Sequence, residues 1–513
     1  MNRTVVFKTN HQDQLSLLPP SYDDLVPTNH PVRIVNTIID NIDISSLEKS
    51  YKGGGTSSYH PRMMLKVIIY AYLRNVYSSR KIEQALHENL HFMWLSGCSK
   101  PDHNTINDFR GKRLKYILKP IFNQVVLLLN EQGYLSIKEL YVDGTKIEAN
   151  ANKYTFVWSK SINNSRDKIT KQLKELWSYV EKVYVNEQQV PNTPNFEAID
   201  PNQVMQTIEQ INIALTDKPV DKKVKQKLNY AKKNWPKNVE KYNQQEAILG
   251  NRGSYSKTDP DATFMRMKDD HMQNGQLKAG YNIQGSSNNQ YIVNYTIEQT
   301  TTDTTTLKKH LEEHIEIFNQ VPQCITADAG YGSEENYQDL EDKNIEAFVK
   351  YNYFHNEQKQ TKVKVDKKPF TTDKLYYNTE TDTYYCPMGQ AMENIGTFQR
   401  KTANGYIQTI DAYQAKNCKG CPIRSLCHKS KTNRIIERNH NLVRLKAKAK
   451  QNLISEQGIA HRKQRCWDIE AIFGNIKQNM NFKRFMLRGI DKIETEFGLI
   501  AMAHNLKKVS LAI

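Results

Sequence analysis

Two aspartates in this chain follow short apolar runs that are typical of buried strands. Asp143 comes directly after Leu140-Tyr-Val, and Asp328 comes after Ile325-Thr-Ala. Carboxylates that follow neighbouring strands can meet at one edge of a sheet, where they can share a metal ion. Taken singly, Asp143 before Gly144 is also typical of a hairpin turn, and Asp328 of the start of a turn.

A third carboxylate, Glu470, lies in a segment with the period of an amphipathic helix. The segment Trp467–Lys477 places Glu470 and Lys477 two turns apart on one face. Its apolar residues form the other face: Ile469, Ile472, Phe473 and Ile476. An acid held against a core in this way is a candidate metal ligand, and a surface acid paired with neighbouring bases is the alternative.

The three acids have no Ser-His or Cys-His pattern that would supply a covalent nucleophile. Asp143, Asp328 and Glu470 therefore predict chemistry with a divalent metal, Mg²⁺ or Mn²⁺. Two such ions about 4 Å apart can activate an attacking oxygen and stabilise a leaving one in phosphoryl transfer. If the attacker is water the site cuts DNA, and if it is a DNA 3′-hydroxyl the site joins two DNAs.

The elements that must position these acids follow a definite order. Strand patterns occur at residues 140–143, 279–285, 290–298, 323–327 and 346–350. Helical patterns at about 304–319 and from 334 onward separate the later strands. This order predicts an α/β protein with a ribonuclease H-like catalytic core, in which a mixed five-stranded sheet is combined with helices. In that fold the first strand, the end of the fourth strand and a late helix converge.

The remaining sequence predicts further domains. An N-terminal all-α domain carries basic residues that suit a helix-turn-helix-like DNA-binding bundle: Arg74, Arg80, Lys81, Arg110, Lys112 and Arg113. A plain helical bundle with solvated charges is the alternative. A polar, Lys-rich stretch with apolar residues at steps of three and four predicts an inserted helical arm, most simply an antiparallel hairpin punctuated by Pro201, Pro219 and Pro236.

These patterns set the expected domain boundaries. They are residues 1–135 for the N-terminal helical DNA-binding domain, 136–152 for the first core strand, 153–255 for the arm, 256–352 for the continued core, 353–440 for a Cys-containing β-rich subdomain, and 441–513 for the C-terminal core helices.

The insertion at 353–440 holds four of the seven cysteines, Cys386, Cys418, Cys421 and Cys427, with His428 beside the last. Thiolates with this pattern suit a structural, tetrahedral Zn²⁺, with His428 as a substitute for one thiol. A small cluster of reduced cysteines explains the pattern equally well.

The composition of the chain indicates which kind of partner it binds and in which cellular compartment it is expected. The 72 Lys and Arg residues exceed the 55 Asp and Glu residues and give a net charge of +17, which favours nucleic acid as the partner. Lys477, Arg484 and Arg488 are expected to contact DNA phosphates, with a solvated basic face as the alternative. No apolar run reaches the roughly 18 residues that span a bilayer, and the first residues lack a signal-peptide core. We therefore expect a cytoplasmic protein, associated with the nucleoid when it is bound to DNA.

In combination, these blocks resemble the bacterial insertion-sequence transposases with an Asp-Asp-Glu (DDE) site, which belong to the ribonuclease H-like superfamily. The similar blocks occur in the family's order: Tyr59–Tyr72, Tyr141–Asn152, Asp259–Ala262, Gly280–Asn282, Ala327–Gly332, Ile469–Lys477 and Arg488-Gly489. The resemblance implies that Asp143, Asp328 and Glu470 are the metal ligands and that Lys477 is the signature lysine.

The chain departs from the family pattern at one position. The signature arginine is expected four residues before the glutamate, where this chain has Cys466, and Arg465 stands beside it as the substitute DNA contact. Asp259, Asp261 and Asp303 are reserve carboxylates that we expect either to have structural roles or to support the metal ligands.

The resemblance also implies a reaction and partners. A DDE transposase would bind the terminal inverted repeats of its own insertion sequence, cleave the DNA, and join the 3′ ends to double-stranded target DNA, as a homodimer in the DNA complex. A ribonuclease H-like nuclease without strand transfer and a non-catalytic DNA-binding regulator are the alternatives.

Overall fold

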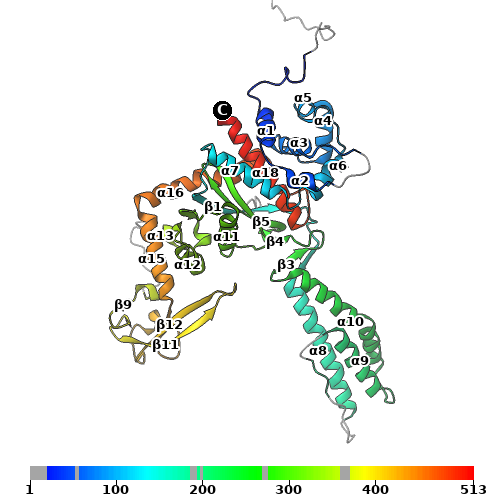
Figure 1. Ribbon diagram of the computed structural model, residues 1–513. Coiled ribbons are helices and arrows are strands. Elements are labelled where there is room, and N and C mark those ends of the chain that lie inside the picture. The colour runs from blue at the N-terminus through cyan, green and yellow to red at the C-terminus, as the bar shows by residue number, and fades with distance from the viewer. Residues whose placement is uncertain are drawn as a thin grey trace, which may run out of the picture. The chain divides into compact units, whose positions relative to one another are not determined.

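The computed structural model describes residues 20–51, 57–184, 193–196, 200–267, 275–358 and 370–512 (Figure 1). The chain divides into two compact units. The first contains Met1–Leu128, Gln478–Phe482 and Thr495–Ile513, and the second contains Leu129–Lys477 and Lys483–Glu494. The last helix thus groups largely with N-terminal residues, whereas the sequence boundaries placed all of 441–513 with the core.

The described part of the first unit is helical. It contains α1 (Pro31–Asp40), α2 (Ser45–Lys49), α3 (Pro61–Leu73), α4 (Ser79–Glu88), α5 (Leu90–Ser96), α6 (His103–Asp108), a π-helical turn (Phe109–Arg113), most of α7 (Leu118–Glu131) and most of α18 (Ile490–Ala512). Helix α3 is the centre of this unit, since all its residues from Val67 to Leu73 are buried. A helix that is apolar on every side is expected at the centre of a bundle.

Arg110 has a different place from the one that its charge suggests. It is buried, and its Nη1 donates to the Tyr72 hydroxyl at 3.0 Å and to the Tyr77 carbonyl at 2.7 Å. The Tyr72 hydroxyl in turn donates to Glu496 at 3.3 Å. Arg110 therefore stabilises the interior of the bundle, and its prediction as a DNA-binding residue is wrong.

A six-stranded mixed sheet forms the centre of the second unit. Its strands are β1 (Glu139–Glu148), β4 (Thr263–Arg266), β5 (Leu277–Asn288), β6 (Tyr291–Glu298), β7 (Cys324–Ala327) and β8 (Glu346–Val349). The order is β4-β5-β1-β7-β8, and β6 also pairs with β5. The β1–β5 pairing is antiparallel, whereas β1, β7 and β8 are parallel. The prediction of five strands missed β4, which extends the sheet along the first residues of β5.

Strand β1 is longer than its apolar run suggests. It continues past Asp143 to Glu148, because Gly144–Glu148 pair in register with β5. Thr145 and Ile147 are buried on this extension. Asp143 therefore lies within a strand, and the hairpin turn that its Asp-Gly sequence favours is excluded.

The described part of the inserted arm contains three helices, α8 (Ser159–Val183), α9 (Pro201–Ala214) and α10 (Lys222–Leu249), which lie side by side in Figure 1. Their apolar stripes share one core that includes Trp177, Ile211 and Trp235. The predicted hairpin of two helices is therefore wrong. Pro201 begins α9 as predicted, but Pro236 lies inside α10 and does not end it, because the buried Trp235 and Val239 on either side hold the helix in this core.

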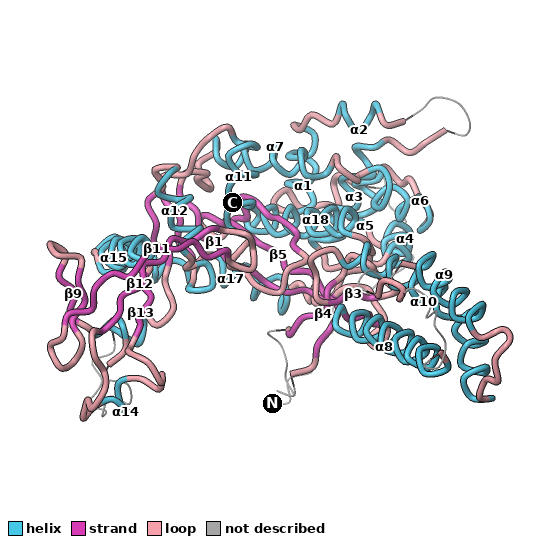
Figure 2. The backbone as a smooth tube through the Cα atoms, turned by 90° about the horizontal axis from the view of Figure 1, so that it is seen from below, coloured by secondary structure: helices cyan, strands magenta, loops and turns pink. Residues whose placement is uncertain are grey.

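The second insertion contains an antiparallel sheet in the order β13-β12-β11-β10-β9. The strands, magenta in Figure 2, are β9 (Tyr376–Asn378), β10 (Thr383–Tyr385), β11 (Ala391–Lys401), β12 (Ile407–Ala415) and β13 (Ile435–Arg438). A short helix, α14 (Arg424–Cys427), precedes β13. Tyr384, Met392 and Tyr413 form much of the small core, and Cys386 and Cys418 pack against it.

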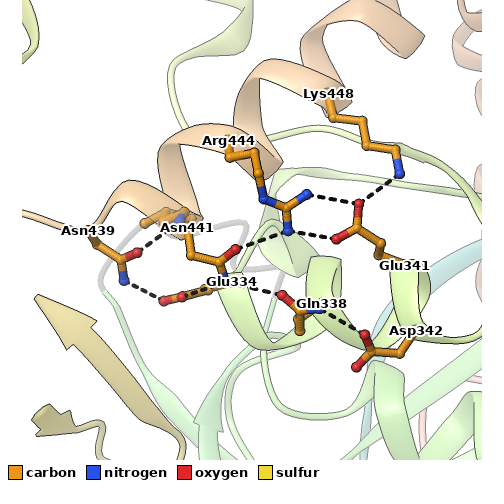
Figure 3. A network of polar contacts seen from close by, with 9 residues as sticks. Glu334, Gln338, Glu341, Asp342, Asn439, Asn441, Arg444 and Lys448 are labelled. Atoms are coloured by element: carbon orange, nitrogen blue, oxygen red, sulfur yellow. Dashed lines mark hydrogen bonds and ion pairs between the residues drawn. The ribbon is translucent and has the colours of Figure 1, made fainter. Parts of the chain in front are cut away.

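A polar network attaches the chain to the core where it returns from this insertion (Figure 3). Helix α15 (His440–Ile454) lies along α12 (Glu334–Asp342). Arg444 on α15 donates from both terminal nitrogens to Glu341 at 3.0 and 2.6 Å, and Lys448 donates to the same carboxylate at 2.8 Å. These cations lower the pKa of Glu341 to about 2. From α15 the chain continues into α16 (Glu456–Trp467) and α17 (Ile469–Gly474), which carries Glu470. Among the helices described, none is both long and apolar enough to cross a membrane.

A buried histidine predicts a pH dependence of stability. His314 on α11 (Leu307–Phe318) lies 3.1 Å through Nε2 from the Ile137 carbonyl. Burial lowers its pKa from 6.5 to about 4, against the opposing effect of that carbonyl. Between these two pH values the unfolded chain binds more protons than the folded chain. The free energy of unfolding should therefore fall as the pH falls through this window, by up to about 3 kcal/mol from this group.

The measurement is the thermal unfolding midpoint from pH 7 to pH 4.5 for the wild type and His314→Gln. Glutamine does not titrate, so the variant should lose less stability over this range than the wild type. Equal losses in both proteins would mean that His314 does not contribute.

Candidate active site

The strand register brings two of the three predicted acids to neighbouring positions. In the parallel β1–β7 pair, Val142 is opposite Ala327, and the next residues along the two chains are Asp143 and Asp328. Adjacent strands are about 4.8 Å apart, so these two aspartates are neighbours across the sheet. Asp143 is buried, and Asp328 is partly exposed just beyond the end of β7. The Asp328 carboxylate accepts a hydrogen bond from the Gly330 amide at 2.8 Å, which fixes it at the start of the following turn.

Helix α17 places Glu470 above the same strands. Asp143 pairs across β1 and β5 with Gly285, which has no side chain, and Phe473 and Ile469 occupy the space above it. A Cβ atom at Gly285 would lie 3.1 Å from Phe473 and 3.5 Å from Ile469. The predicted apolar face is confirmed, since Ile469, Ile472, Phe473 and Ile476 are all buried.

The start of α17 is anchored by Asp468, which the sequence did not single out. Asp468 is fully buried and accepts a hydrogen bond from the Ser287 hydroxyl at 2.5 Å. Burial raises its pKa. Because Ser287 belongs to β5, this contact ties the junction between α16 and α17 to the sheet, two residue pairs away from Asp143.

Arg465, on the last turn of α16, lies between two of the acids. Its Nη2 donates to Glu470 Oε1 at 2.5 Å, and its Nη1 is 3.6 Å from Asp143 Oδ2. The Arg465 side chain is 7% exposed, whereas that of Glu470 is 45% exposed. The structure thus connects Asp143 with Glu470 through a buried guanidinium group.

Asp303 supports these strands from the opposite face of the sheet. Side chains alternate along β1, so Gly144 faces away from the side on which Asp143 points. A Cβ atom at Gly144 would lie 2.6 Å from Asp303 Oδ1, an oxygen that accepts hydrogen bonds from Asn282 at 2.7 Å and Gln284 at 2.9 Å. These contacts agree with the structural role expected for Asp303, and they show why residue 144 must be small.

The pKa of Tyr331 reflects the negative charge of the aspartates around it. It is fully buried in the turn after Asp328, and its hydroxyl donates to Gln284 Oε1. Burial raises its pKa well above 10, and Asp303, Asp143 and Asp328 raise it further, while Arg465 opposes them. The three aspartates and Arg465 are therefore close enough to act on one hydroxyl.

The three carboxylates are suitable metal ligands by their chemistry, but they are not arranged around one metal position. Carboxylate oxygens from β1, from the end of β7 and from α17 are the ligands that Mg²⁺ or Mn²⁺ prefers. Within the ranges that the structure describes, however, no group of three or more His, Cys, Asp or Glu side chains is arranged to hold a metal ion. Arg465 supplies the positive charge between Asp143 and Glu470 instead.

The basic residues predicted near the acids have diverse surroundings. Lys477 is buried in a π-helical turn, Asn475–Asn479, so the predicted α-helix over 467–477 is wrong in its last part. Arg484 donates to the carbonyls of Ala149 at 3.2 Å and Ala151 at 3.0 Å, and Arg488 donates to the Asn150 carbonyl at 2.7 Å. These two arginines hold the segment that follows β1.

The other predicted site residues lie elsewhere. Arg80 and Lys81 are exposed on the first turn of α4. Cys386, Cys418, Cys421 and Cys427 line one cavity together with His428. Asp259 accepts hydrogen bonds from Tyr281 and the Gly489 amide, and Asp261 accepts one from the Ile490 amide, which agrees with the structural roles expected for them.

Comparisons with protein families give two matches. Residues 20–112 match a family described as a transposase domain (DUF772), and residues 385–510 match one described as a transposase DDE domain. Both matches support an insertion-sequence DDE transposase. No curated protein and no solved structure matches this chain.

The two matched segments contain only part of the candidate site. The DDE match includes Glu470, Lys477, Arg465 and the four clustered cysteines of this transposase, whereas Asp143 and Asp328 lie outside both matches. The case for these two aspartates therefore depends on the register of β1 and β7 and on the contacts described above.

The packing of α17 on Gly285 gives a testable prediction. Gly285→Val would place methyl groups where Phe473 and Ile469 lie, so α17 must move away from the sheet and carry Glu470 with it. We expect thermal unfolding at lower temperature, with a loss of about 1–3 kcal/mol of stability, and reduced DNA cleavage. Gly253→Val is the matched control, because nothing lies within 4 Å of a Cβ atom there. Unchanged stability and cleavage in Gly285→Val would show that α17 does not depend on this contact.

Proposed function

We propose that this transposase binds the terminal inverted repeats of its insertion sequence, cleaves the DNA there and joins the 3′ ends to target DNA. Its central sheet is then a ribonuclease H-like core, with Asp143, Asp328 and Glu470 as the metal ligands. The observation that carries the proposal is the register of β1 and β7, which makes Asp143 and Asp328 neighbours beneath the helix of Glu470. The strand order agrees with that fold if β4 is treated as an addition to its edge.

Each acid would contribute in a different way. When bound, two Mg²⁺ or Mn²⁺ ions would activate the attacking oxygen and stabilise the leaving oxygen of an in-line displacement. Asp143 is held rigidly inside a strand, so it would fix the position of the site. Asp328 lies at the edge of the sheet, and the Glu470 side chain is half exposed, so these two can reach groups that arrive from solvent.

The charge of the chain supports DNA as the substrate. A net charge of +17 attracts a polyanion from solution. Arg80 and Lys81 begin a helix, where backbone amides also favour phosphate, so they are the candidate contacts on the first unit. Lys477 and Arg465 are the candidate contacts beside the acids. DNA as substrate places the reaction on the nucleoid in the cytoplasm, and processing two ends together calls for a homodimer.

Single substitutions at the acids test the reaction. Asp143→Asn, Asp328→Asn and Glu470→Gln keep the shape of each side chain but remove its charge. Each should lower cleavage and strand transfer of linear end DNA in Mg²⁺ by at least about a hundredfold, because interactions that stabilise the transition state typically contribute this much. DNA binding in band-shift assays should be unchanged. Asp167→Asn, an exposed aspartate on α8, is the control and should retain full activity.

The pattern of products separates the alternatives. Joined products from the wild type support a transposase, and cleavage without joining supports a nuclease of the same fold. Binding without either product supports a DNA-binding regulator. Wild-type activity in Asp328→Asn would remove that residue from the site.

We propose a second, structural metal in the β-rich insertion. Its four thiols line one cavity, and several sulfurs accept hydrogen bonds, as metal-bound thiolates do. Cys386 accepts from the Gln390 amide at 3.3 Å, Cys418 from the Arg434 amide at 3.4 Å, and Cys427 from Arg434 Nη1 at 2.8 Å. Both ring nitrogens of His428 are buried without a hydrogen-bond partner among the described residues. Zn²⁺ would satisfy this donor set once these side chains turn toward one another, because the described donors are not arranged to hold a metal ion as they stand.

Metal analysis tests this second site. The full chain, purified without added zinc, should carry about one equivalent of Zn²⁺, and Cys421→Ser should lower both the zinc content and the thermal stability. Cys98→Ser changes an exposed cysteine outside the insertion and should leave both unchanged. Zinc below about half an equivalent in the wild type would favour reduced thiols that bind no metal.

A further inference from the structure

Arg465 is an unusual buried cation. Among the described residues, Arg465 makes one hydrogen bond, from Nη2 to Glu470 Oε1 at 2.5 Å, while Nη1 lies 3.6 Å from Asp143 Oδ2. Nε and Nη1 have no hydrogen-bond partner within the described ranges. Buried guanidinium groups normally use their donors, because an unsatisfied buried donor is costly. The attraction of the surrounding carboxylates, more than a complete set of hydrogen bonds, therefore holds Arg465 in this position.

The local backbone explains why Arg465 and Glu470 meet. Helix α16 ends at Trp467 and α17 begins at Ile469, with Asp468 between them at φ −87° and ψ −92°. In one continuous helix, residues five apart do not lie on the same face. The break at Asp468 changes the direction of the chain and lets Arg465 and Glu470 approach each other. The anchor of Asp468 on Ser287 keeps this break above Asp143.

We propose that Arg465 is the counter-cation of the metal-free site: its guanidinium holds the Asp143 and Glu470 carboxylates until a divalent cation replaces it. This inference rests on the proposed function, in which both carboxylates are metal ligands. Mg²⁺ binds oxygen ligands at about 2.0–2.1 Å, so it would compete with the guanidinium for these two carboxylates. Two cations so close repel each other in a buried site. In this proposal, metal binding therefore separates Arg465 from Asp143.

The proposal also accounts for the difference between the predicted and the observed contacts of Arg465. The sequence predicted that Arg465 contacts DNA, whereas in the structure its guanidinium lies beside the carboxylates of Asp143 and Glu470. A displaced guanidinium would remain beside the site at the end of α16, with its donors open to an incoming phosphate. The same exchange explains why the described donors do not form a metal site while Arg465 is in place.

The consequence is a competition that can be measured without DNA. Removing the positive charge should raise metal affinity, since the metal no longer displaces a bound cation. Even ligands that bind at two distinct sites are typically coupled by 5- to 150-fold, so for direct competition we expect Arg465→Gln to bind Mn²⁺ more tightly than the wild type by about fivefold or more. Without metal, the variant should unfold at a lower temperature, because the carboxylates then repel each other.

The experiment is Mn²⁺ titration of the full chain, with free Mn²⁺ followed by electron paramagnetic resonance, and thermal unfolding in EDTA and in Mn²⁺. Arg465→Lys keeps a point charge without the planar fork and should give an intermediate affinity. Lys463→Gln removes an exposed charge from the same helix and should match the wild type. Mn²⁺ should raise the unfolding midpoint of Arg465→Gln more than that of the wild type.

Asp143→Asn and Glu470→Gln separate the two possible failures. If either binds Mn²⁺ as the wild type does, that residue is not a metal ligand and the proposed site is wrong. If both lose Mn²⁺ binding but Arg465→Gln binds no more tightly than the wild type, the metal site stands and the counter-cation is overturned. If Arg465→Gln does not fold, Arg465→Lys decides, because affinity equal to or weaker than the wild type overturns the proposal.

Discussion

The register of β1 between β5 and β7 is the constraint on which the rest of the site depends. It makes Asp143 the neighbour of Asp328 on one side and of Gly285 on the other. A slip of one residue would turn Asp143 to the opposite face of the sheet. The buried side chains along β1 oppose such a slip, because they would exchange faces as well. Parallel pairing with β7 and antiparallel pairing with β5 thus determine where the first two carboxylates lie, and Gly285 leaves the space that α17 needs to bring the third.

A second consequence of this geometry is a concentration of negative charge. Asp143, Asp328 and Asp303 all act on the buried Tyr331 hydroxyl, and Glu470 joins Asp143 through Arg465. Buried carboxylates are costly unless they are paired. A fold that brings them together must supply a cation. In this structure the cation is Arg465, and in the proposed reaction it is a divalent metal, so both states satisfy the same physical requirement.

The sequence predicted the elements better than their details. Apolar residues were sufficient to predict β1, β5, β6, β7, β8 and α17, because the strands contain runs of buried residues and α17 has a buried apolar face. They did not predict the length of β1, since Gly144 and Lys146 are stabilised by pairing with β5 and not by their own propensity. Pro236 was expected to interrupt the arm, but it lies inside α10, because the packing of Trp235 and Val239 outweighs the local cost of a proline in a helix.

Charges were the least predictable part of the site. Four arginines that look alike in the sequence have three different roles in the structure. Arg110 stabilises the interior of the helical bundle, and Arg465 pairs with the acids. Arg484 and Arg488 donate hydrogen bonds to backbone carbonyls. The position of Asp303 behind Gly144 had no sequence signal beyond an acid in a threonine-rich run. Contacts between residues far apart in the chain decide these roles, and periodicity carries no information about them.

The most direct test of this account is the anomalous scattering of Mn²⁺ in crystals of the full chain with its end DNA. The account predicts a manganese peak within bonding distance of carboxylate oxygens of Asp143 and Asp328, with Arg465 displaced from Asp143. A peak bound by other residues, with Arg465 still against Asp143, would contradict it.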